Sequence, residues 1–241
     1  MKLNLNLVKL RGTVFTQQIN YSPQIITALS DILRGYLPSF VTVIPQNNSI
    51  PNAIVSNFWE MVNPTTGERI QFNNMKIDIV QSFDIPYKEE VISKFSSHCS
   101  AVFCRLAEIT GQSVSRLAIA PTFSCTDDSN KIARFAQDIY VKNSFKDAKI
   151  ENCAFNNIFR INEMIGEKSF LINYLANVYA ANRVDNIDGK NLIRETIAVD
   201  FDINTFANEK YVFGISEIRA FFDKASQMSK SFFDFYFADN Q

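Results

Sequence analysis

Residues 87–111 of the chain read YKEEVISKFSSHCSAVFCRLAEITG, and this stretch decides the fold class. Its apolar side chains recur at the spacing of one helix face. They are Val91, Ile92, Phe95, Cys99, Val102, Phe103, Leu106 and Ile109. Gly111 follows as a helix stop signal. The sequence therefore predicts a long amphipathic helix over residues 87–110, which needs an apolar layer to pack against.

The segments before this helix predict antiparallel strands. Residues 3–17 alternate apolar and polar side chains, and a change of phase predicts a bulge near Gly12. Strands are also expected over the stretches 54–62 and 70–83, joined by the turn residues 63–67 and divided by Asn73-Asn74. Ahead of them, Ser22-Pro23 predicts the start of a helix that runs to Gly35, followed by a strand over 40–44.

The same order of elements starts again after Gly111. A strand is expected over 114–123 and a helix from Asp127 or Asp128 to Tyr140. A hairpin around Gly166 joins strands 153–162 and 169–180, and residues 185–191 predict a turn-rich loop. A strand over 192–203 and a long helix over 214–237 complete the pattern.

Each half of the chain thus predicts the order β-α-β-β-β-α. Both hairpins carry a similar turn, Gly67-Glu68-Arg69 and Gly166-Glu167-Lys168. We therefore expect an α+β fold with antiparallel sheets and long packed helices, built either from two tandem half-repeats or from a common order that recurs by coincidence. The halves are residues 1–111 and 112–241. We expect them to form one compact unit, with two sheets that join edge to edge or pack as a pair.

The composition narrows the classes of function. The chain has 22 Phe but a single His, and its net charge is −1. A near-neutral chain has no global field that would draw it to nucleic acid or to an anionic membrane. The four cysteines form no CxxC pair, and the N-terminus lacks the apolar run of a signal peptide. We expect a cytoplasmic protein with free thiols and no membrane segment.

A candidate metal site lies in the predicted strand Val199–Asn204. The two-residue period of a strand places Asp200 and Asp202 on one face. Two such carboxylates can bind Mg²⁺, which could orient a phosphate. The alternative is a half-exposed strand with its polar residues turned to solvent, and the chain has no Gly-rich phosphate loop before this strand.

Cations on half-buried strands give a second candidate site. Arg116 lies in the strand over 114–123, and Lys9 and Arg11 belong to the first strand. A cation that faces inward on a sheet needs a carboxylate partner or an anionic ligand. We predict that Arg116 binds a ligand, unless one of the carboxylates Glu60, Asp78 or Glu195 pairs with it.

Aromatic residues crowd the end of the last predicted helix. They include Phe232, Phe233, Phe235 and Phe237. A helix cannot bury all of these rings on one stripe, so we expect Phe235 and Phe237 to leave the main apolar face. The rings form either a docking or homodimer surface, or a helix end embedded between two layers.

Other motifs carry less chemistry. Residues 131–149 are locally basic with interleaved rings, which is typical of a single-strand nucleic-acid site or of a solvated helix face. His98 and Cys99 are neighbours on one helix and point about 100° apart, so they form no nucleophile–base pair. We predict no catalytic residue and no resident cofactor other than Mg²⁺ at Asp200 and Asp202.

Several short motifs resemble an uncharacterised, sporadically distributed bacterial family of α+β proteins. The resemblance rests on Phe58-Trp59-Glu60 before a hairpin and on Arg116-Leu117-Ala118-Ile119 after a long helix. It also rests on Val199-Asp200-Phe201-Asp202-Ile203 and on the aromatic terminal helix. The family has no settled activity, so the resemblance implies no catalytic residue. It implies a bacterial accessory or defence-associated role.

Three hypotheses of function follow. The favoured one is a non-enzymatic binding protein that acts through protein–protein contacts or as a homodimer. The second is a metal-dependent enzyme or sensor for nucleotides or phosphate esters that uses Asp200 and Asp202. The third is a nucleic-acid-binding module.

Overall fold

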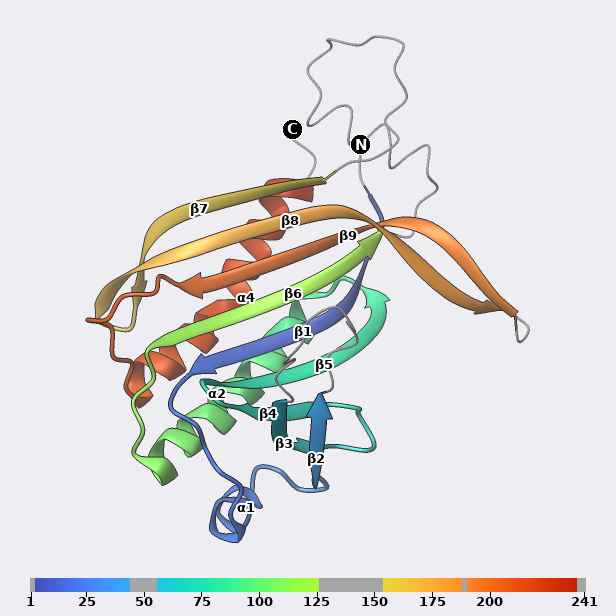
Figure 1. Ribbon diagram of the computed structural model, residues 1–241. Helices are drawn as coiled ribbons and strands as arrows, with labels where there is room; N and C mark the ends of the chain where they lie inside the picture. The colour runs from blue at the N-terminus through green and yellow to red at the C-terminus, as the bar shows by residue number, and fades with distance from the viewer. Residues whose placement is uncertain (1–2, 44–55, 126–153, 188–189, 238–241) are drawn as a thin grey trace, which may run out of the picture.

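The computed structural model describes residues 3–43, 56–125, 154–187 and 190–237. Within this part of the chain, one antiparallel sheet of nine strands has the order β2-β3-β4-β5-β1-β6-β9-β8-β7 (Figure 1). The strands of the first half are β1 (Leu5–Phe15), β2 (Leu37–Val43), β3 (Ser56–Val62), β4 (Arg69–Asn73) and β5 (Lys76–Pro86). Those of the second half are β6 (Arg116–Cys125), β7 (Ala154–Ile165), β8 (Lys168–Ile187) and β9 (Lys190–Thr205).

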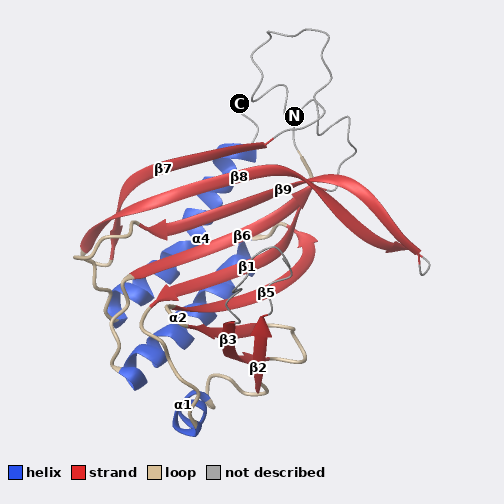
Figure 2. Ribbon diagram, in the orientation of Figure 1, coloured by secondary structure: helices blue, strands red, loops and turns tan. Residues whose placement is uncertain are grey.

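Both long helices cover one face of this sheet. Helix α2 (Glu89–Thr110) and helix α4 (Ile215–Phe237) pack against each other behind the strands (Figure 2). The short helix α1 (Pro23–Leu29) lies beyond the end of α2. The α+β class and the packed long helices are therefore confirmed.

The two halves share a single sheet, so the edge-to-edge alternative is confirmed and the packing of two separate sheets is wrong. Strand β1 pairs with β5 on one side and with β6 on the other. The ten-residue β6 offers a complete ladder edge to β1, and pairing there satisfies backbone groups that two separate sheets would leave open. The sheet thus continues across the boundary that the sequence predicts at residue 111.

The bulge in β1 lies earlier than predicted. The pairing register shifts between Leu7 and Lys9 on both sides of β1. Against β6 the extra residue is Val8, whereas against β5 the extra residue lies on β5 between Ser82 and Ile85. Leu7 and Leu10 are three positions apart, yet both are fully buried. An inserted residue is what brings both side chains to the same face of a strand.

Gly12, where the bulge was expected, has a different role. A Cβ atom at this position would lie 2.5 Å from the Sγ atom of Cys99 on α2. Gly12 pairs with Ile79 on one side and with Ile119 on the other, so the ladder is regular here. The absence of a side chain lets α2 approach the centre of the sheet closely.

The helix ends follow the capping rules, with one correction. Ser22 caps α1 by accepting a hydrogen bond from the backbone N of Ile25 at 3.2 Å, and Gly111 ends α2 with a φ of 62°. Helix α1 ends at Leu29 rather than near Gly35. There Ser30 donates both its backbone N and its hydroxyl to the carbonyl oxygen of Thr27, which closes the turn early.

The hairpins are placed as predicted, but one expected loop is a strand. Asn73-Asn74 divides β4 from β5, and Gly166 turns β7 into β8 with a φ of 62°. Residues 185–187 and 190–191 belong to β8 and β9, because each pairs across the hairpin and the ladder satisfies its backbone. This long β8–β9 hairpin projects beyond the sheet (Figure 1). The predicted helix from Asp127 and the link after it lie outside the described residues.

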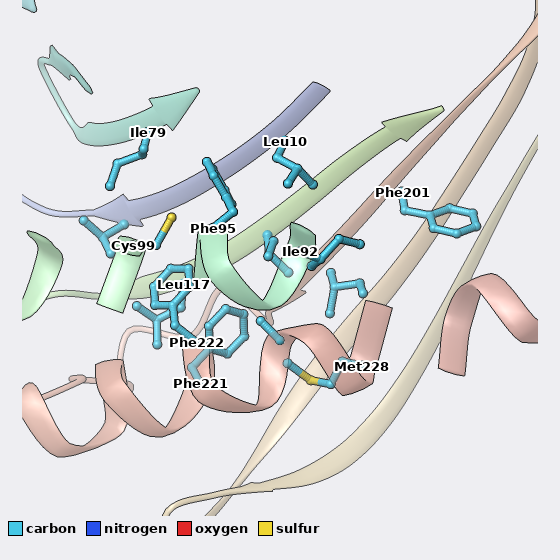
Figure 3. Close-up of a cluster of buried hydrophobic side chains, with 14 of the residues drawn as sticks. Leu10, Ile79, Ile92, Phe95, Cys99, Leu117, Phe201, Phe221, Phe222 and Met228 are labelled. Carbon is cyan, nitrogen blue, oxygen red and sulfur yellow. The ribbon is translucent and has the colours of Figure 1, made fainter. Parts of the chain in front are cut away.

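The core fills the space between the sheet and the two long helices. Leu10, Ile79 and Leu117 point from the strands toward Phe95 and Phe222 on the helices (Figure 3). Burying one such side chain contributes about 1.5–3 kcal/mol. No helix among the described residues has both the length and the apolarity that crossing a membrane requires.

Candidate ligand-binding site

The sheet has a second face, turned away from α2 and α4, which we call the distal face. Side chains on a strand alternate between faces, and Leu10, Gly12 and Val14 of β1 point toward the helices. Lys9, Arg11, Thr13 and Phe15 of the same strand therefore belong to the distal face. Its chemistry is polar and charged, in contrast to the apolar helix side.

A hollow of about 580 Å³ lies on this distal face over four strands. Its lining comes from β1, β3, β4 and β5 and from the turn between β4 and β5. The lining residues are Lys9, Arg11, Phe15, Phe58, Gln71, Asn73, Asn74, Met75, Lys76, Asp78 and Val80. Cross-strand pairing explains the grouping, because Arg11 pairs with Val80 and Asp78 pairs with Gln71.

The carboxylate in the hollow already has its partners. Asp78 is buried and accepts a hydrogen bond from the hydroxyl of Thr13 at 2.6 Å. Its other oxygen lies 2.7 Å from Nζ of Lys76 and 3.4 Å from Nδ2 of Asn73. Asp78 thus neutralises Lys76 and is held in place from three sides.

Two cations in the hollow have no such partner. Among the described residues, neither Lys9 nor Arg11 forms an ion pair. The Nε atom of Arg11 is buried and makes no hydrogen bond within this part of the chain. A buried donor without an acceptor is costly, and an anionic ligand would supply the acceptor.

Glu60, the neighbouring carboxylate on the distal face, also has its own partners. Glu60 on β3 is buried and lies 3.4 Å from Nη1 of Arg69 and 3.2 Å from Nε2 of Gln71. It therefore does not neutralise Lys9 or Arg11. The local charge of the hollow is positive.

Arg116 lies at the edge of the same region, beside the hollow rather than in it. Its guanidinium covers the ring of Phe15, 5.0 Å from the centroid, and Phe15 lines the hollow. It donates to Oδ1 of Asn204 at 2.7 Å and to the carbonyl of Thr205 at 3.2 Å. Both acceptors are neutral groups. They hold the guanidinium of Arg116 in place but do not neutralise its positive charge.

The expected carboxylate partners of Arg116 are engaged elsewhere. Glu60 pairs with Arg69, and Asp78 pairs with Lys76. The side chain of Glu195 is outside the described part of the structure. The ligand-binding role of Arg116 stays a prediction, with its charge directed to the face that holds the hollow.

Asn204 links Arg116 to the predicted metal site. This fully buried amide accepts from Arg116 and from Nδ2 of Asn173, and it donates to Oδ1 of Asp202 at 3.0 Å. Asp200 accepts from the hydroxyl of Tyr179 at 2.9 Å. Burial, together with this carboxylate, raises the pKa of Tyr179.

Asp200 and Asp202 point to the distal face, as the strand period predicts. Thr122 separates Asp200 from Lys9, since Thr122 pairs with both of them across the sheet. No group of three His, Cys, Asp or Glu side chains with metal-binding proximity occurs among the described residues. Magnesium at this pair stays a prediction.

The aromatic residues of α4 divide between core and surface. Phe232 and Phe237 are buried, so the expectation that Phe237 leaves the apolar face is wrong. The ring of Phe237 stacks over Phe201 of β9, which widens the buried stripe of the helix. Phe233 is half-buried against Tyr87, whose ring lies 4.1 Å away. Phe235 is exposed as predicted and is the ring of this set available for an interaction.

A half-buried cluster that the sequence did not predict joins three segments. His98 on α2 lies 2.8 Å from the carboxylate of Glu68, which also accepts from the hydroxyl of Tyr36. Burial and this hydrogen bond raise the pKa of Tyr36. Cys99 points away toward Gly12, and burial raises the pKa of its thiol. The cluster therefore ties α2 to the β3–β4 turn and holds no activated nucleophile.

The structure thus defines an α+β protein with a cationic hollow on the sheet face opposite its helices. The chain matches no protein-family model and no curated protein. The resemblance to a bacterial family stays a prediction. The basic stretch 131–149 lies outside the described residues, so the nucleic-acid hypothesis stays a prediction as well.

Proposed function

We propose that this chain is a binding protein that holds a small organic anion in the distal-face hollow. The observation that carries the proposal is the unpaired charge of Lys9 and Arg11 in a hollow of about 580 Å³. Ligand pockets for small molecules measure roughly 300–1,000 Å³. A molecule the size of a nucleotide fits this range.

The lining indicates the chemistry of the ligand. Its cations are Lys9, Arg11 and Lys76, and its single carboxylate is Asp78. A guanidinium binds phosphate or carboxylate through charge-assisted hydrogen bonds. Phe15 and Phe58 supply ring surfaces in the same hollow, which favour a ligand with an aromatic or apolar part.

Binding without bond-making is the simpler use of this site. A general base must be able to accept a proton from the substrate. Asp78 is instead engaged by Thr13, Lys76 and Asn73, and these contacts favour its role as a support for Lys76. We therefore propose a non-enzymatic function for the hollow.

Thermal stabilisation by a panel of anions tests the proposal. The panel contains nucleoside mono-, di- and triphosphates, inorganic phosphate and aromatic carboxylates. The best ligand should raise the melting temperature of the wild type and lose at least ~10-fold in affinity in Arg11→Ala, which corresponds to about 1.4 kcal/mol. Lys94→Ala removes an exposed cation from α2 and should bind like the wild type.

Two results would count against the proposal that the hollow binds an anion. One is a wild type that no anion in the panel stabilises. The other is a ligand that loses the same affinity in Lys94→Ala and in Arg11→Ala, which would indicate a general charge effect. Rising salt should weaken specific binding only moderately, because few charges are involved.

A second candidate is a metal-dependent nucleotide sensor or enzyme that uses Asp200 and Asp202. It is supported by their position on the distal face, where Thr122 alone stands between Asp200 and Lys9 in the cross-strand row. Two strand spacings are about 10 Å, which a nucleotide can bridge. This candidate predicts nucleotide binding that requires Mg²⁺ and is lost in Asp202→Asn.

Two wider proposals concern origin and location. We propose that the halves 1–111 and 112–241 derive from one common unit, supported by the similar turns at Gly67 and Gly166, although residues 1–111 have the order β-α-β-β-β-β-α with one strand more than predicted. Separate expression of the halves should then yield fragments that reassociate, and insoluble fragments would oppose the proposed duplication.

We also propose a cytoplasmic location, supported by the buried free thiols of Cys99 and Cys104. Secretion of the chain by its source cells would contradict this.

A further inference from the structure

Strand β7 forms one outer edge of the sheet. It has 12 residues and pairs with β8 along its full length. On its other side it pairs with no strand of the described chain. An edge of this kind presents backbone N–H and C=O groups that can pair with another strand.

The two edges of the sheet differ in how they discourage such pairing. The opposite edge, β2, has 7 residues and contains Pro38, which has no N–H to donate. Strand β7 contains no proline, and its charged residues are one Arg and one Glu. Arg160 donates to Asn173, and Glu163 binds Lys224 of α4, so both charges are tied back to the same molecule.

Apolar side chains are exposed on both faces of β7. Ile158 and Met164 on the distal face are 54% and 55% exposed. Phe159 and Ile161 on the helix face are 38% and 49% exposed. Phe235 of α4, which is 65% exposed, extends the patch because its ring centroid lies 5.5 Å from that of Phe159. Clustered exposed apolar residues mark interaction surfaces.

We propose that a second copy of this chain pairs its β7 with this edge in antiparallel register about Ile161. In this register Ile161 faces its own equivalent, and Ile158 faces Met164 of the second copy. Arg160 then faces Asn162, so no like charges are opposed. A register centred on Arg160 would place two arginines opposite each other, which is unfavourable.

The self-complementarity of β7 is the reason for choosing a second copy as the partner. An isologous contact uses the same patch on both copies and closes at two. Pairing about Ile161 covers Ile158, Ile161 and Met164 on both chains. It places Phe159 opposite Glu163 of the second copy, whose carboxylate pairs with Lys224 of its own chain. The result is one continuous sheet through the dimer.

Sedimentation at several concentrations tests the assembly. The wild type should have twice the mass of one chain, which is 27.5 kDa. Ile161→Lys opposes two charges at the centre of the contact and should raise the dissociation constant at least ~100-fold. Leu37→Lys introduces the same charge at an exposed apolar position of β2, at the opposite edge of the sheet, and should leave the dimer intact.

A cysteine pair tests the register independently of stability. In a Cys153→Ser background, Ile161→Cys should form a covalent dimer under mild oxidation, because each new thiol faces its equivalent. Ile158→Cys faces Met164 instead and should cross-link poorly with itself. Mixing Ile158→Cys with Met164→Cys should restore cross-linking.

Each contrary result has a definite meaning. A monomeric wild type overturns the proposal. A dimer that Ile161→Lys does not weaken, or a mass above two chains, overturns it too. Ile161 is four strands from β1 in the sheet, so these variants leave the distal-face hollow unchanged.

Discussion

Gly12 shows how one residue determines the distance between two layers. Its missing Cβ would lie 2.5 Å from Sγ of Cys99, well inside contact distance. Phe222 of α4 lies 3.5 Å from the same point, so both long helices are close to this position. The helices can pack this closely against the centre of the sheet only because residue 12 has no side chain.

Gly12→Ala should therefore destabilise the fold by about 2 kcal/mol, the usual cost of overpacking a core. Cys99→Ala removes the sulfur that would clash with the new Cβ atom. The loss of unfolding free energy in the double variant should therefore be smaller than the sum of the losses in the two single variants. Urea unfolding of the four proteins measures this coupling. Additive effects would show that Gly12 and Cys99 do not share the contact.

At the residue scale, the sequence predicts candidates but not their partners. Lys9, Arg11 and Arg116 could be identified as cations on half-buried strands. Their surroundings depend on Phe58, Gln71 and Lys76, which are far away in the sequence and reach the hollow through cross-strand register. Register is set by the whole sheet, so no local pattern reveals it.

At the element scale, α4 is anchored where it begins. Glu217 accepts from the backbone N of Gly214 at 3.1 Å and lies 2.6 Å from Nζ of Lys168 at the start of β8. The hydrogen bond from Lys168 is the main cause that lowers the pKa of Glu217 to about 2. The carboxylate also suits the positive end of the helix dipole.

Glu217→Gln should lower stability by about 1 kcal/mol near neutral pH, in the range of a lost N-terminal cap. A carboxyl whose pKa is lower in the folded state stabilises above its unfolded value of 4.5, and this contribution is lost as the pH falls toward 2. The gap between wild type and variant should therefore close over this acidic range.

Denaturant unfolding across the acidic range measures this gap. Glu108→Gln is the control, because Glu108 forms an exposed pair with Arg105 at 3.1 Å. Exposed pairs contribute little, so the control should track the wild type at every pH. A Glu217→Gln gap that stays constant down to the acid limit would assign the effect to packing instead of charge.

Long periodic elements were the predictable ones. The helix over 87–110, the terminal helix and both hairpins follow from spacing and turn residues. The bulge at Val8 and the extended β8–β9 hairpin did not, because alternation along one strand does not show where its partner gains or loses register. Turn residues such as Asp185 and Asn191 are overridden by pairing.

At the scale of the molecule, the pairing of β1 with β6 makes one continuous sheet whose two faces differ in chemistry. The helix face holds the aromatic core, and the distal face gathers Lys9, Arg11 and Arg116 on the two central strands. Composition alone predicts an aromatic core, and eleven of the 22 Phe are buried in it among the described residues. The distal-face hollow could not be predicted in this way, because it spans four strands from separate parts of the first half.

The most direct measurement is a crystal structure of the chain with the tightest-binding anion from the panel. We expect the anionic group to accept a hydrogen bond from Nε of Arg11, and the apolar part of the ligand to lie against Phe15 or Phe58. An anion bound elsewhere, with Arg11 untouched, would contradict the assignment of the hollow as the ligand site.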